Sequence, residues 1–406
     1  MYQEKSPWLV NYYESEIPPY TLPELLQCSD GSRVTTVTEW EQKRRPELLQ
    51  IFKDFMYGDL PPMPDKVKYE QLSPAVKVFD GLGTRQEIRI VFQMNNGTSH
   101  AVTMLLYLPS TPGPHPVFSG LTFAGNHSLE LDERITVTGT AGEGSSTFKW
   151  ERGSQRRRFP LQVILQRNYA LATVSYHDFF PDLIDGWSGS IYKLFYPAEV
   201  LRNRPAGRSA ISAWAWGNSR MLDCLETLPE IDGSRAAVYG LSRLGKTSLW
   251  TGVNDERFKL TCVTDAGCGG SALSRRLYGE TLYSMYQFNN FGYFWFSDRL
   301  EEYALHPEQL PFDQHELIAL AAPRGIAIHS ATNDLWADPA SEYSALYHAG
   351  KLYELYGIPH LQSNRQPSPD TPVSTGKMGY MLRTGKHDML LEDWLHYLDM
   401  ADQILI

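Results

Sequence analysis

A strand-like stretch that turns into a helix at a single serine limits the fold of this chain most strongly. Residues 236–239 are apolar and favour a strand, Gly240 and Ser242 follow, and residues 244–250 are compatible with a helix. This order is typical of a nucleophile elbow, in which glycine permits the strained turn and the serine oxygen is presented at the strand end. The usual pattern, G-x-S-x-G, is one residue longer here. The segment reads Gly240-Leu241-Ser242-Arg243-Leu244-Gly245-Lys246.

Expected strands alternate with expected helices along most of the chain. The expected strands are residues 85–92, 101–108, 115–123, 169–176, 236–239, 258–263 and 326–330. The expected helices are residues 37–57, 211–228, 244–250 and 390–405. A hairpin signal, Asn95-Asn96-Gly97-Thr98, joins the first two strands. This alternation predicts an α/β fold of the α/β-hydrolase type, a three-layer αβα sandwich around a mostly parallel sheet.

The length of 406 residues allows one large domain or two medium ones. We interpret residues 1–70, which are rich in proline, as an N-terminal wrap, and residues 71–406 as the catalytic domain. Insertions are expected near 130–160 and 270–312. Catalytic groups in such a sheet lie beyond the carboxyl ends of its strands.

Composition narrows the choice of partners. The net charge of −10 argues against nucleic acid and against an anionic membrane surface as partners. No apolar run reaches 18 residues, so no transmembrane helix is expected. The four cysteines form no C-x-x-C pair, which makes a structural zinc site unexpected. We expect no metal, no cofactor and a monomer.

A serine nucleophile needs a base and an acid. Seven histidines follow the elbow, namely His306, His315, His329, His348, His360, His387 and His396. His387 lies in a polar turn before the last helix, where the histidine of an α/β-hydrolase falls, whereas His329 lies in an apolar strand and His396 lies within a helix. Asp265 and Asp334 each follow a predicted strand, so either is a candidate acid to orient the imidazole.

Two cationic side chains and one amide lie near the predicted nucleophile. The main-chain N–H of Arg243 is placed for an oxyanion hole, and its guanidinium adds positive charge. Lys246 lies one helical turn after Ser242 and is expected to donate hydrogen bonds to substrate hydroxyls or to a carboxyl-derived group. Asn126, in the turn after an expected strand, is a further candidate for the oxyanion side.

Several segments resemble the glucuronoyl esterases, carbohydrate esterase family 15, across about residues 35–405. The elbow resembles the family's G-C-S-R-x-G-K. The other matching segments are Phe123-Ala124-Gly125-Asn126-His127, Ile211-Ser212-Ala213-Trp214-Ala215-Trp216-Gly217, Ala266-Gly267-Cys268-Gly269-Gly270, Gly279-Glu280-Thr281, Pro311-Phe312-Asp313-Gln314-His315, Ala322-Pro323-Arg324, Asn333-Asp334-Leu335-Trp336-Ala337-Asp338-Pro339, Gly379-Tyr380, Arg383 and Gly385-Lys386-His387-Asp388.

The resemblance implies a bacterial-type serine esterase that cleaves esters of 4-O-methyl-glucuronic acid, as in links between glucuronoxylan and lignin, without a metal. It implies that Ser242 is the nucleophile, His387 the base and Arg243 the oxyanion arginine. Asp265 falls where the family often has a glutamate, and Asp334 falls at the alternative acid position of bacterial members. The implied sugar-binding residues are Lys246, Glu280, Trp336 and Gln287.

The chain departs from the fungal pattern at two places. Leu241 replaces the usual cysteine beside the nucleophile. Residues 283–296 contain no glutamate, Gln287 fits the fungal glutamine position only with a shifted register, and Glu280 is expected to take over sugar binding. Two other functions remain open at this point. One is a carboxylesterase or acetyl esterase acting on another carbohydrate, and the other is a catalytically silent carbohydrate-binding protein on the same fold.

The N-terminal sequence leaves two expectations for localisation. Residues 1–5 lack the pattern of a secretory leader. We expect a secreted or periplasmic protein if a leader was removed, as the resemblance implies, and a cytoplasmic one if Met1 is the native start.

Overall fold

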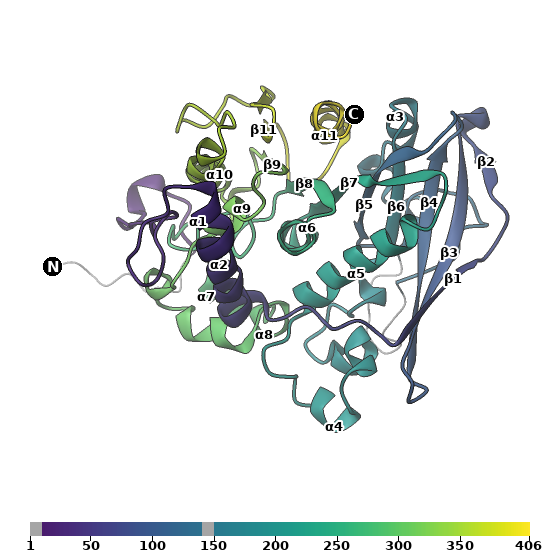
Figure 1. Ribbon diagram of the computed structural model, residues 1–406, viewed down its shortest axis with the longest axis horizontal. Coiled ribbons are helices and arrows are strands. Elements are labelled where there is room, and N and C mark those ends of the chain that lie inside the picture. Colours follow the sequence, from purple (N-terminus) through teal and green to yellow (C-terminus); the bar gives the residue numbers. More distant parts are fainter. Residues whose placement is uncertain (1–9, 140–149) are drawn as a thin grey trace.

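A central sheet organises the chain in the computed structural model, which describes residues 10–139 and 150–406 (Figure 1). Its strand order is β1-β3-β4-β6-β5-β7-β8-β9-β11-β10, and β2 pairs with β3. The strands are β1 Lys66–Gln71, β2 Val76–Val78, β3 Gly83–Gln93, β4 Ser99–Pro109, β5 His115–Thr122, β6 Ala170–Ser175, β7 Ile231–Leu241, β8 Phe258–Thr264, β9 Gly325–Ala331, β10 Val373–Ser374 and β11 Met378–Arg383.

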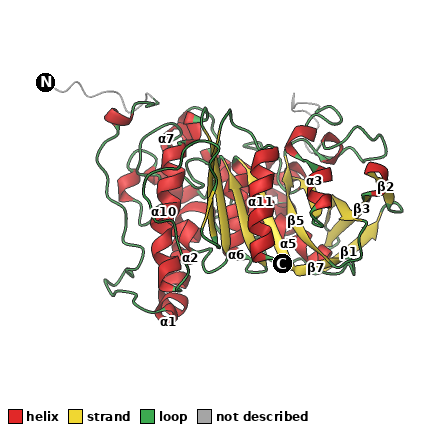
Figure 2. Cartoon of the chain, turned by 90° about the horizontal axis from the view of Figure 1, so that it is seen from above, coloured by secondary structure: helices red, strands yellow, loops and turns green. Residues whose placement is uncertain are grey.

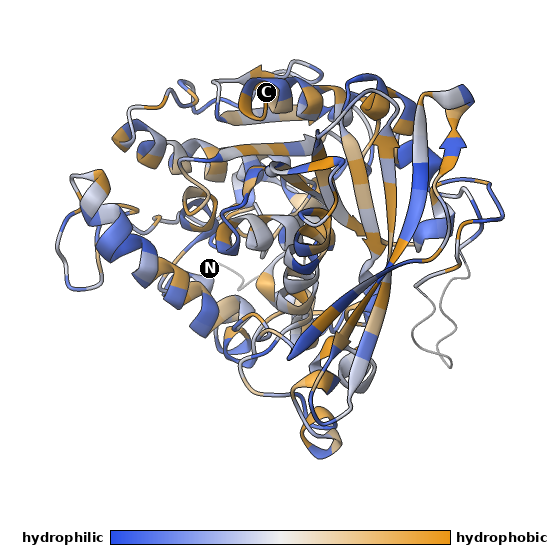
Figure 3. Ribbon diagram, turned by 45° about the vertical axis from the view of Figure 1, so that its right-hand side comes forward, coloured by the Kyte–Doolittle hydropathy of each residue, from blue (hydrophilic) through white to orange (hydrophobic). Residues whose placement is uncertain are grey.

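The sheet combines an antiparallel edge with a parallel centre. Strands β1, β3, β4 and β6 pair antiparallel, whereas β6, β5, β7, β8, β9 and β11 are parallel to one another. Every residue of β5, β6, β9 and β11 is buried, as expected for strands covered on both faces. Figure 3 shows apolar positions along the inner strands and hydrophilic positions on the outer antiparallel strands.

Helices cover both faces of the sheet, and each face has its own apolar core. The helices are α1 Val37–Glu39, α2 Arg45–Phe52, α3 Leu161–Gln166, α4 Ala198–Leu201, α5 Ala210–Leu225, α6 Arg243–Asn254, α7 Leu282–Gln287, α8 Gly292–Trp295, α9 Gln314–Ala319, α10 Pro339–Leu355 and α11 Leu391–Ile404. Side chains of α5, α6, α9 and α10 share one core, and those of α3 and α11 share the other. Figure 2 shows the strands crossing the molecule among these helices. The predicted α/β-hydrolase fold with a mostly parallel sheet is confirmed.

The helix predicted at residues 37–57 is present, although two π-helical segments, Trp40–Arg44 and Lys53–Tyr57, interrupt it. It begins with a capping box, in which the Thr36 hydroxyl accepts the Glu39 N–H at 3.2 Å. It ends at Gly58, whose φ of 74° is a conformation that glycine adopts at little cost. Buried aromatic and aliphatic side chains of this helix join the core that contains α9 and α10.

The division of the chain into residues 1–70 and 71–406 stays a prediction, as do the two insertions. Strand β1 crosses the expected boundary and pairs with β3. Residues 140–149 of the first expected insertion lie outside the described residues. The second contains α7, α8 and short 3-10 turns. Among the helices of the described residues, none is long and apolar enough to cross a membrane.

The turn from β7 into α6 is possible only with glycine at position 240. A Cβ atom there would lie 1.9 Å from the main-chain oxygen of Leu244, and main-chain atoms of a tight turn cannot move away. A Cβ at Gly233, on the same strand, would meet mainly the side chain of Glu226, which is exposed and pairs with Arg257 at 2.8 Å, so a side-chain shift rather than a main-chain movement relieves the contact.

We therefore expect Gly240→Ala to lower the free energy of unfolding by about 3 kcal/mol or more, at the upper end of single substitutions. The matched control Gly233→Ala should stay within about 1 kcal/mol of the wild type. Urea unfolding followed by tryptophan fluorescence measures both. Equal destabilisation of the two variants would contradict this account of the turn.

Candidate active site

Ser242 occupies a strained turn between β7 and α6. Its φ of 59° and ψ of −128° lie outside the regions that side-chain-bearing residues favour, at a cost of about 1–3 kcal/mol. Two main-chain hydrogen bonds hold the turn: the Ser242 N–H donates to Thr264 O at 2.8 Å, and the Lys246 N–H donates to Ser242 O at 2.9 Å. The strand–serine–helix turn predicted from the sequence is present.

The fold brings His387 and both candidate acids to one edge of the sheet. Asp265 follows β8, Asp334 follows β9, and His387 follows β11, and these strands are neighbours of β7 in parallel order. The His387 Nδ1–H donates to Asp334 Oδ2 at 2.5 Å, whereas Asp265 Oδ2 lies 3.9 Å from the same nitrogen. Asp334 is therefore the acid in hydrogen-bonding contact with the imidazole.

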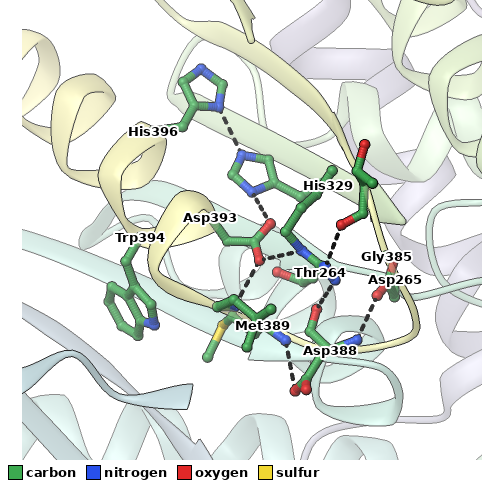
Figure 4. Close-up of polar contacts among 12 residues, drawn as sticks. Thr264, Asp265, His329, Gly385, Asp388, Met389, Asp393, Trp394 and His396 are labelled. Atoms are coloured by element: carbon green, nitrogen blue, oxygen red, sulfur yellow. Dashed lines mark hydrogen bonds and ion pairs between the residues drawn. The ribbon is translucent and has the colours of Figure 1, made fainter. Parts of the chain in front are cut away.

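Asp265 lies deeper and bonds to the main chain beside the histidine. Its Oδ2 accepts the N–H of Asp388 at 3.2 Å, a contact visible in Figure 4. Burial raises the pKa of the Asp265 carboxyl well above its usual range, and the nearby carboxyls of Glu342 and Asp334 raise it further. The two aspartates thus differ in their surroundings, and Asp265 is much harder to ionise than a solvated aspartate.

Ser242 is half-buried, and the His387 side chain is 40% exposed, so both reach solvent. Among the described residues, the structure contains no hydrogen bond between the Ser242 hydroxyl and the imidazole. Contacts between a nucleophile and its base are often long without substrate and tighten when it binds.

Arg243 lies among aromatic rings beside Ser242. Its guanidinium carbon is 4.6 Å from the ring centroid of Trp295 and 5.0 Å from that of Phe291. Asp182 forms an ion pair with this guanidinium and also accepts the Trp295 Nε1–H at 2.8 Å. These contacts fix the cation, while its buried Nε has no hydrogen-bond partner among the described residues.

Lys246 is buried and points at protein acceptors. Its ammonium donates to Ala266 O and Cys268 O, both at 2.6 Å, and to Glu280 Oε2 at 3.0 Å. Since an ammonium has three N–H groups, these contacts use its full donor capacity. The other Glu280 oxygen, Oε1, accepts the Trp336 Nε1–H at 3.2 Å. Lys246 and Trp336 together orient Glu280, and the expected contact of Lys246 with a sugar stays a prediction.

Two other sequence candidates lie apart from this hydrogen-bonded set. Gln287 is exposed at the last residue of α7, and its expected role in sugar binding stays a prediction. Asn126 is buried, and its side-chain amide donates to Thr103 O at 2.8 Å. This contact anchors Asn126 to β4 rather than to the elbow.

The structure adds residues that the sequence reasoning missed. Asp182 has no motif signal because its partner Arg243 is far away along the chain. Tyr12 comes from the N-terminal segment, where the main-chain oxygen of Asn11 accepts the Gly279 N–H at 2.9 Å. Burial and the negative charge of Asp334 raise the pKa of Tyr12, and the Tyr12 ring packs edge-on against that of Tyr278.

Within the described residues, one group has the donor atoms and spacing to hold a metal ion: Asp265, Asp334 and His387, whose ligand atoms lie within 4.8 Å of one another. These are the atoms that the acid–histidine pair uses. The expectation that no metal takes part stays a prediction.

Glu342, on α10, links the loop after β8 to β9 beneath the two aspartates. One of its oxygens accepts the Gly267 N–H at 3.0 Å and the Ser271 hydroxyl at 2.5 Å, and the other accepts the Ser330 hydroxyl at 2.6 Å. Burial raises the pKa of Glu342 to about 7. Since its ordinary pKa is lower, ionisation of Glu342 destabilises the folded protein as the pH rises from the ordinary value to about 7.

We therefore expect Glu342→Gln to gain stability relative to the wild type as the pH rises from about 5 to 8, by up to about 3 kcal/mol. The amide keeps the size of the side chain and removes the charge. Urea unfolding of both proteins at several pH values measures the difference in free energy of unfolding. A difference that does not change with pH would contradict the assignment.

Known proteins resemble this chain in sequence and in structure. A family model described as "Glucuronyl esterase, fungi" matches residues 164–357. Carbohydrate esterase MZ0003, from an unknown prokaryotic organism, is 37% identical over 97% of this chain and 91% of its own length. A 4-O-methyl-glucuronoyl methylesterase of Schizophyllum commune is 30% identical over 83% of this chain and 74% of its own length.

Solved structures agree with the sequence relatives. A structure described as a promiscuous CE15 esterase from the marine bacterial metagenome has a TM-score of 0.87 and 36% identity, and the match covers 97% of this chain and 100% of that one. A glucuronoyl esterase from Solibacter usitatus has a TM-score of 0.88 and 34% identity, over 96% of this chain and 99% of that one. The resemblance noted in the sequence is confirmed: this chain belongs to carbohydrate esterase family 15, the glucuronoyl esterases, and is a carboxylic ester hydrolase.

Proposed function

We propose that this enzyme hydrolyses esters of glucuronic acid and 4-O-methyl-glucuronic acid with a Ser242–His387–Asp334 triad. The observation that carries the proposal is the 2.5 Å contact of His387 with Asp334 at the strand edge where the elbow presents Ser242. Relatives named 4-O-methyl-glucuronoyl methylesterase support the substrate class.

The proposed reaction has two steps. The Ser242 oxygen attacks the ester carbonyl carbon while its proton passes to His387 Nε2, and the tetrahedral intermediate then expels the alcohol, which takes that proton. Water next attacks the glucuronoyl-serine, with His387 again as the base, and Ser242 recovers its proton as the uronic acid leaves. Asp334 holds the Nδ1–H and stabilises the imidazolium in both steps.

Charge that develops on the carbonyl oxygen needs donors that are already in place. The main-chain N–H of Arg243 directly follows the nucleophile, the position that supplies one oxyanion donor in this fold. The guanidinium of Arg243 adds a fixed positive charge beside it. Because Asp182 and the rings already hold this cation, it needs little reorganisation during the reaction.

Glu280 and Trp336 are the residues proposed to bind the sugar ring of the uronic acid, which is the acyl part of the ester. Glu280 is buried, and Trp336 is half-buried in the loop that follows Asp334. A carboxylate held by Lys246 and an indole is a fixed hydrogen-bond acceptor for a sugar hydroxyl. We propose glucuronoxylan–lignin fragments as the larger substrate, a secreted or periplasmic location, a monomeric protein and no need for a cofactor.

A broader esterase activity is the second candidate. The solved relative described as promiscuous favours it, because that chain matches this one over nearly its whole length. Steady-state rates on benzyl glucuronate, benzyl galacturonate and acetylated xylan separate the two candidates. A preference for the glucuronate ester of about tenfold or more in kcat/KM supports the first, and similar rates on all three support the second.

Replacing the nucleophile tests the triad. We expect Ser242→Ala to lower kcat on benzyl glucuronate by about 10³-fold or more, since the remaining binding and oxyanion groups supply only residual catalysis. Thr247→Ala, on the same helix, is the matched control and should keep most of the activity. An unchanged rate in Ser242→Ala would refute the mechanism, and a wild-type protein that hydrolyses no ester above the buffer rate would leave only the carbohydrate-binding role.

The two acids should differ in effect. Asp334→Asn removes the negative charge that stabilises the imidazolium and can present an amide N–H to His387 Nδ1, which selects the wrong tautomer, and it should lower kcat by about 10²- to 10⁴-fold. Asp265→Asn keeps an oxygen for the Asp388 N–H and should cost less than about tenfold, because the raised pKa of Asp265 already disfavours its charge. Values of kcat measured at one pH on one ester show which acid orients His387. A larger loss in Asp265→Asn than in Asp334→Asn would assign that role to Asp265.

A further inference from the structure

The loop that carries His387 has no regular secondary structure to hold it. Residues 384–388 connect the end of β11 to the stretch before α11. The 2.5 Å contact with Asp334 nevertheless requires a fixed main-chain position for His387, because a shift of about 1 Å in a reacting group can cost about 10²-fold in rate. Something in the surrounding structure must supply that position.

The guanidinium of Arg383 bonds to the main chain on both sides of His387. Its Nη2 donates to Lys386 O at 2.8 Å and to Asp388 O at 2.9 Å, and its Nη1 donates to Thr384 O at 3.3 Å. Only 3% of the Arg383 side chain is exposed, so water competes little for these bonds. One planar group therefore spans the whole loop.

Arg383 is itself held by Asp393, in the first turn of α11. The Arg383 Nε–H donates to Asp393 Oδ2 at 2.9 Å, and the same oxygen accepts the Leu390 N–H at 2.8 Å, which caps the helix. Asp393 is completely buried. A buried carboxylate needs such partners, and removing either member of the pair leaves an uncompensated charge.

Two stacked histidines, His329 and His396, extend the hydrogen bonds of Asp393 (Figure 4). The position of the proton on each ring follows from these contacts. His329 Nδ1 lies 3.1 Å from Asp393 Oδ1, and His329 Nε2 lies 2.8 Å from His396 Nδ1. Burial lowers the pKa of both imidazoles, to about 3 for His396. With both rings neutral, His396 Nδ1–H donates to His329 Nε2, and His329 Nδ1–H donates to Asp393.

We propose that Arg383 is a positioning residue for the catalytic base. Held by the buried Asp393, its guanidinium fixes the carbonyl groups on either side of His387 and so sets the His387–Asp334 hydrogen bond. This inference rests on the proposed role of His387. Arginine is required because its planar fork makes four contacts from three nitrogens, to three carbonyl groups and to the Asp393 carboxylate, whereas a lysine ammonium has only three N–H groups on a single nitrogen.

The loop keeps other contacts when Arg383 is replaced, so we expect activity to be lowered rather than abolished. The Asp388 N–H still donates to Asp265, and the Asp388 carboxylate still pairs with Arg158 at 2.6 Å and with Arg157 at 2.5 Å. The loop therefore stays attached without Arg383. A variant should fold and bind substrate, with the base displaced rather than lost.

Arg275 offers a matched control in the same protein. It is also buried, donates to Phe312 O and Leu310 O at 2.6 Å each, and pairs with the buried Asp313 at 3.3 Å. Its carbonyl partners lie in the segment before α9 rather than beside His387. Arg275→Lys therefore removes an arginine with the same kind of hydrogen bonds to main-chain carbonyl groups, but from a different loop.

The experiment compares Arg383→Lys, Arg383→Met and Arg275→Lys in the full chain, with benzyl glucuronate as substrate. We expect Arg383→Lys to lower kcat by about 10- to 100-fold with KM within about threefold, and Arg383→Met to lower kcat further. The downfield proton NMR signal of the His387 Nδ1–H, identified by its loss in Asp334→Asn, should weaken in both Arg383 variants. Arg275→Lys should keep the signal and a kcat within about twofold.

The outcomes separate this inference from the proposed function. If His387→Ala keeps wild-type activity, the proposed function fails. If His387→Ala is inactive but Arg383→Lys retains kcat and the proton signal, the positioning role alone is overturned, and equal losses in Arg275→Lys would overturn it too. Should Arg383→Lys not fold, Asp393→Asn replaces it, with an expected loss in kcat of about 3- to 10-fold, and an unchanged kcat there would contradict the proposal.

Discussion

The strained main chain at Ser242 is the constraint on which the site depends. A φ of 59° at a residue with a side chain is stable only because the surrounding structure leaves no alternative. The hydrogen bond from the Ser242 N–H to Thr264 O connects the turn to β8. Because Gly240 has no Cβ, the first turn of α6 can pack closely against the end of β7. In the proposed mechanism the turn thereby fixes where the ester lies, and the loops after β8, β9 and β11 converge on that point.

Buried charge is the second organising feature of the site. Lys246 and Glu280 form one ion pair behind Ser242, and Arg383 and Asp393 form another beneath the loop of His387. Asp265 instead accepts a main-chain hydrogen bond in a position where its charged form is disfavoured. Asp334 therefore contacts His387 directly while Asp265 holds the main chain beside it, so the two aspartates have different contacts at one edge of the sheet.

The sequence predicted the features that depend on neighbours along the chain. The elbow, the hairpin of β3 and β4 and the long helix at 37–57 follow from local patterns of apolar residues and glycine. Strand β11 and helix α10 were missed, because Gly379 interrupts the short strand and because buried polar residues such as Glu342 blur the apolar face of the helix. The choice of acid, and the partners of Arg243 and Lys246, depend on contacts between distant segments, which no spacing in the sequence encodes.

The central claim is that Ser242 becomes covalently acylated with His387 as its base. The most direct measurement is peptide mapping by mass spectrometry after reaction with an alkyl fluorophosphonate, because only an activated serine oxygen attacks such a phosphorus centre. The account predicts one label per chain, on Ser242, in proportion to the loss of esterase activity, and little labelling of the His387→Ala variant. Inactivation with the label on another residue, or full activity with Ser242 labelled, would contradict it.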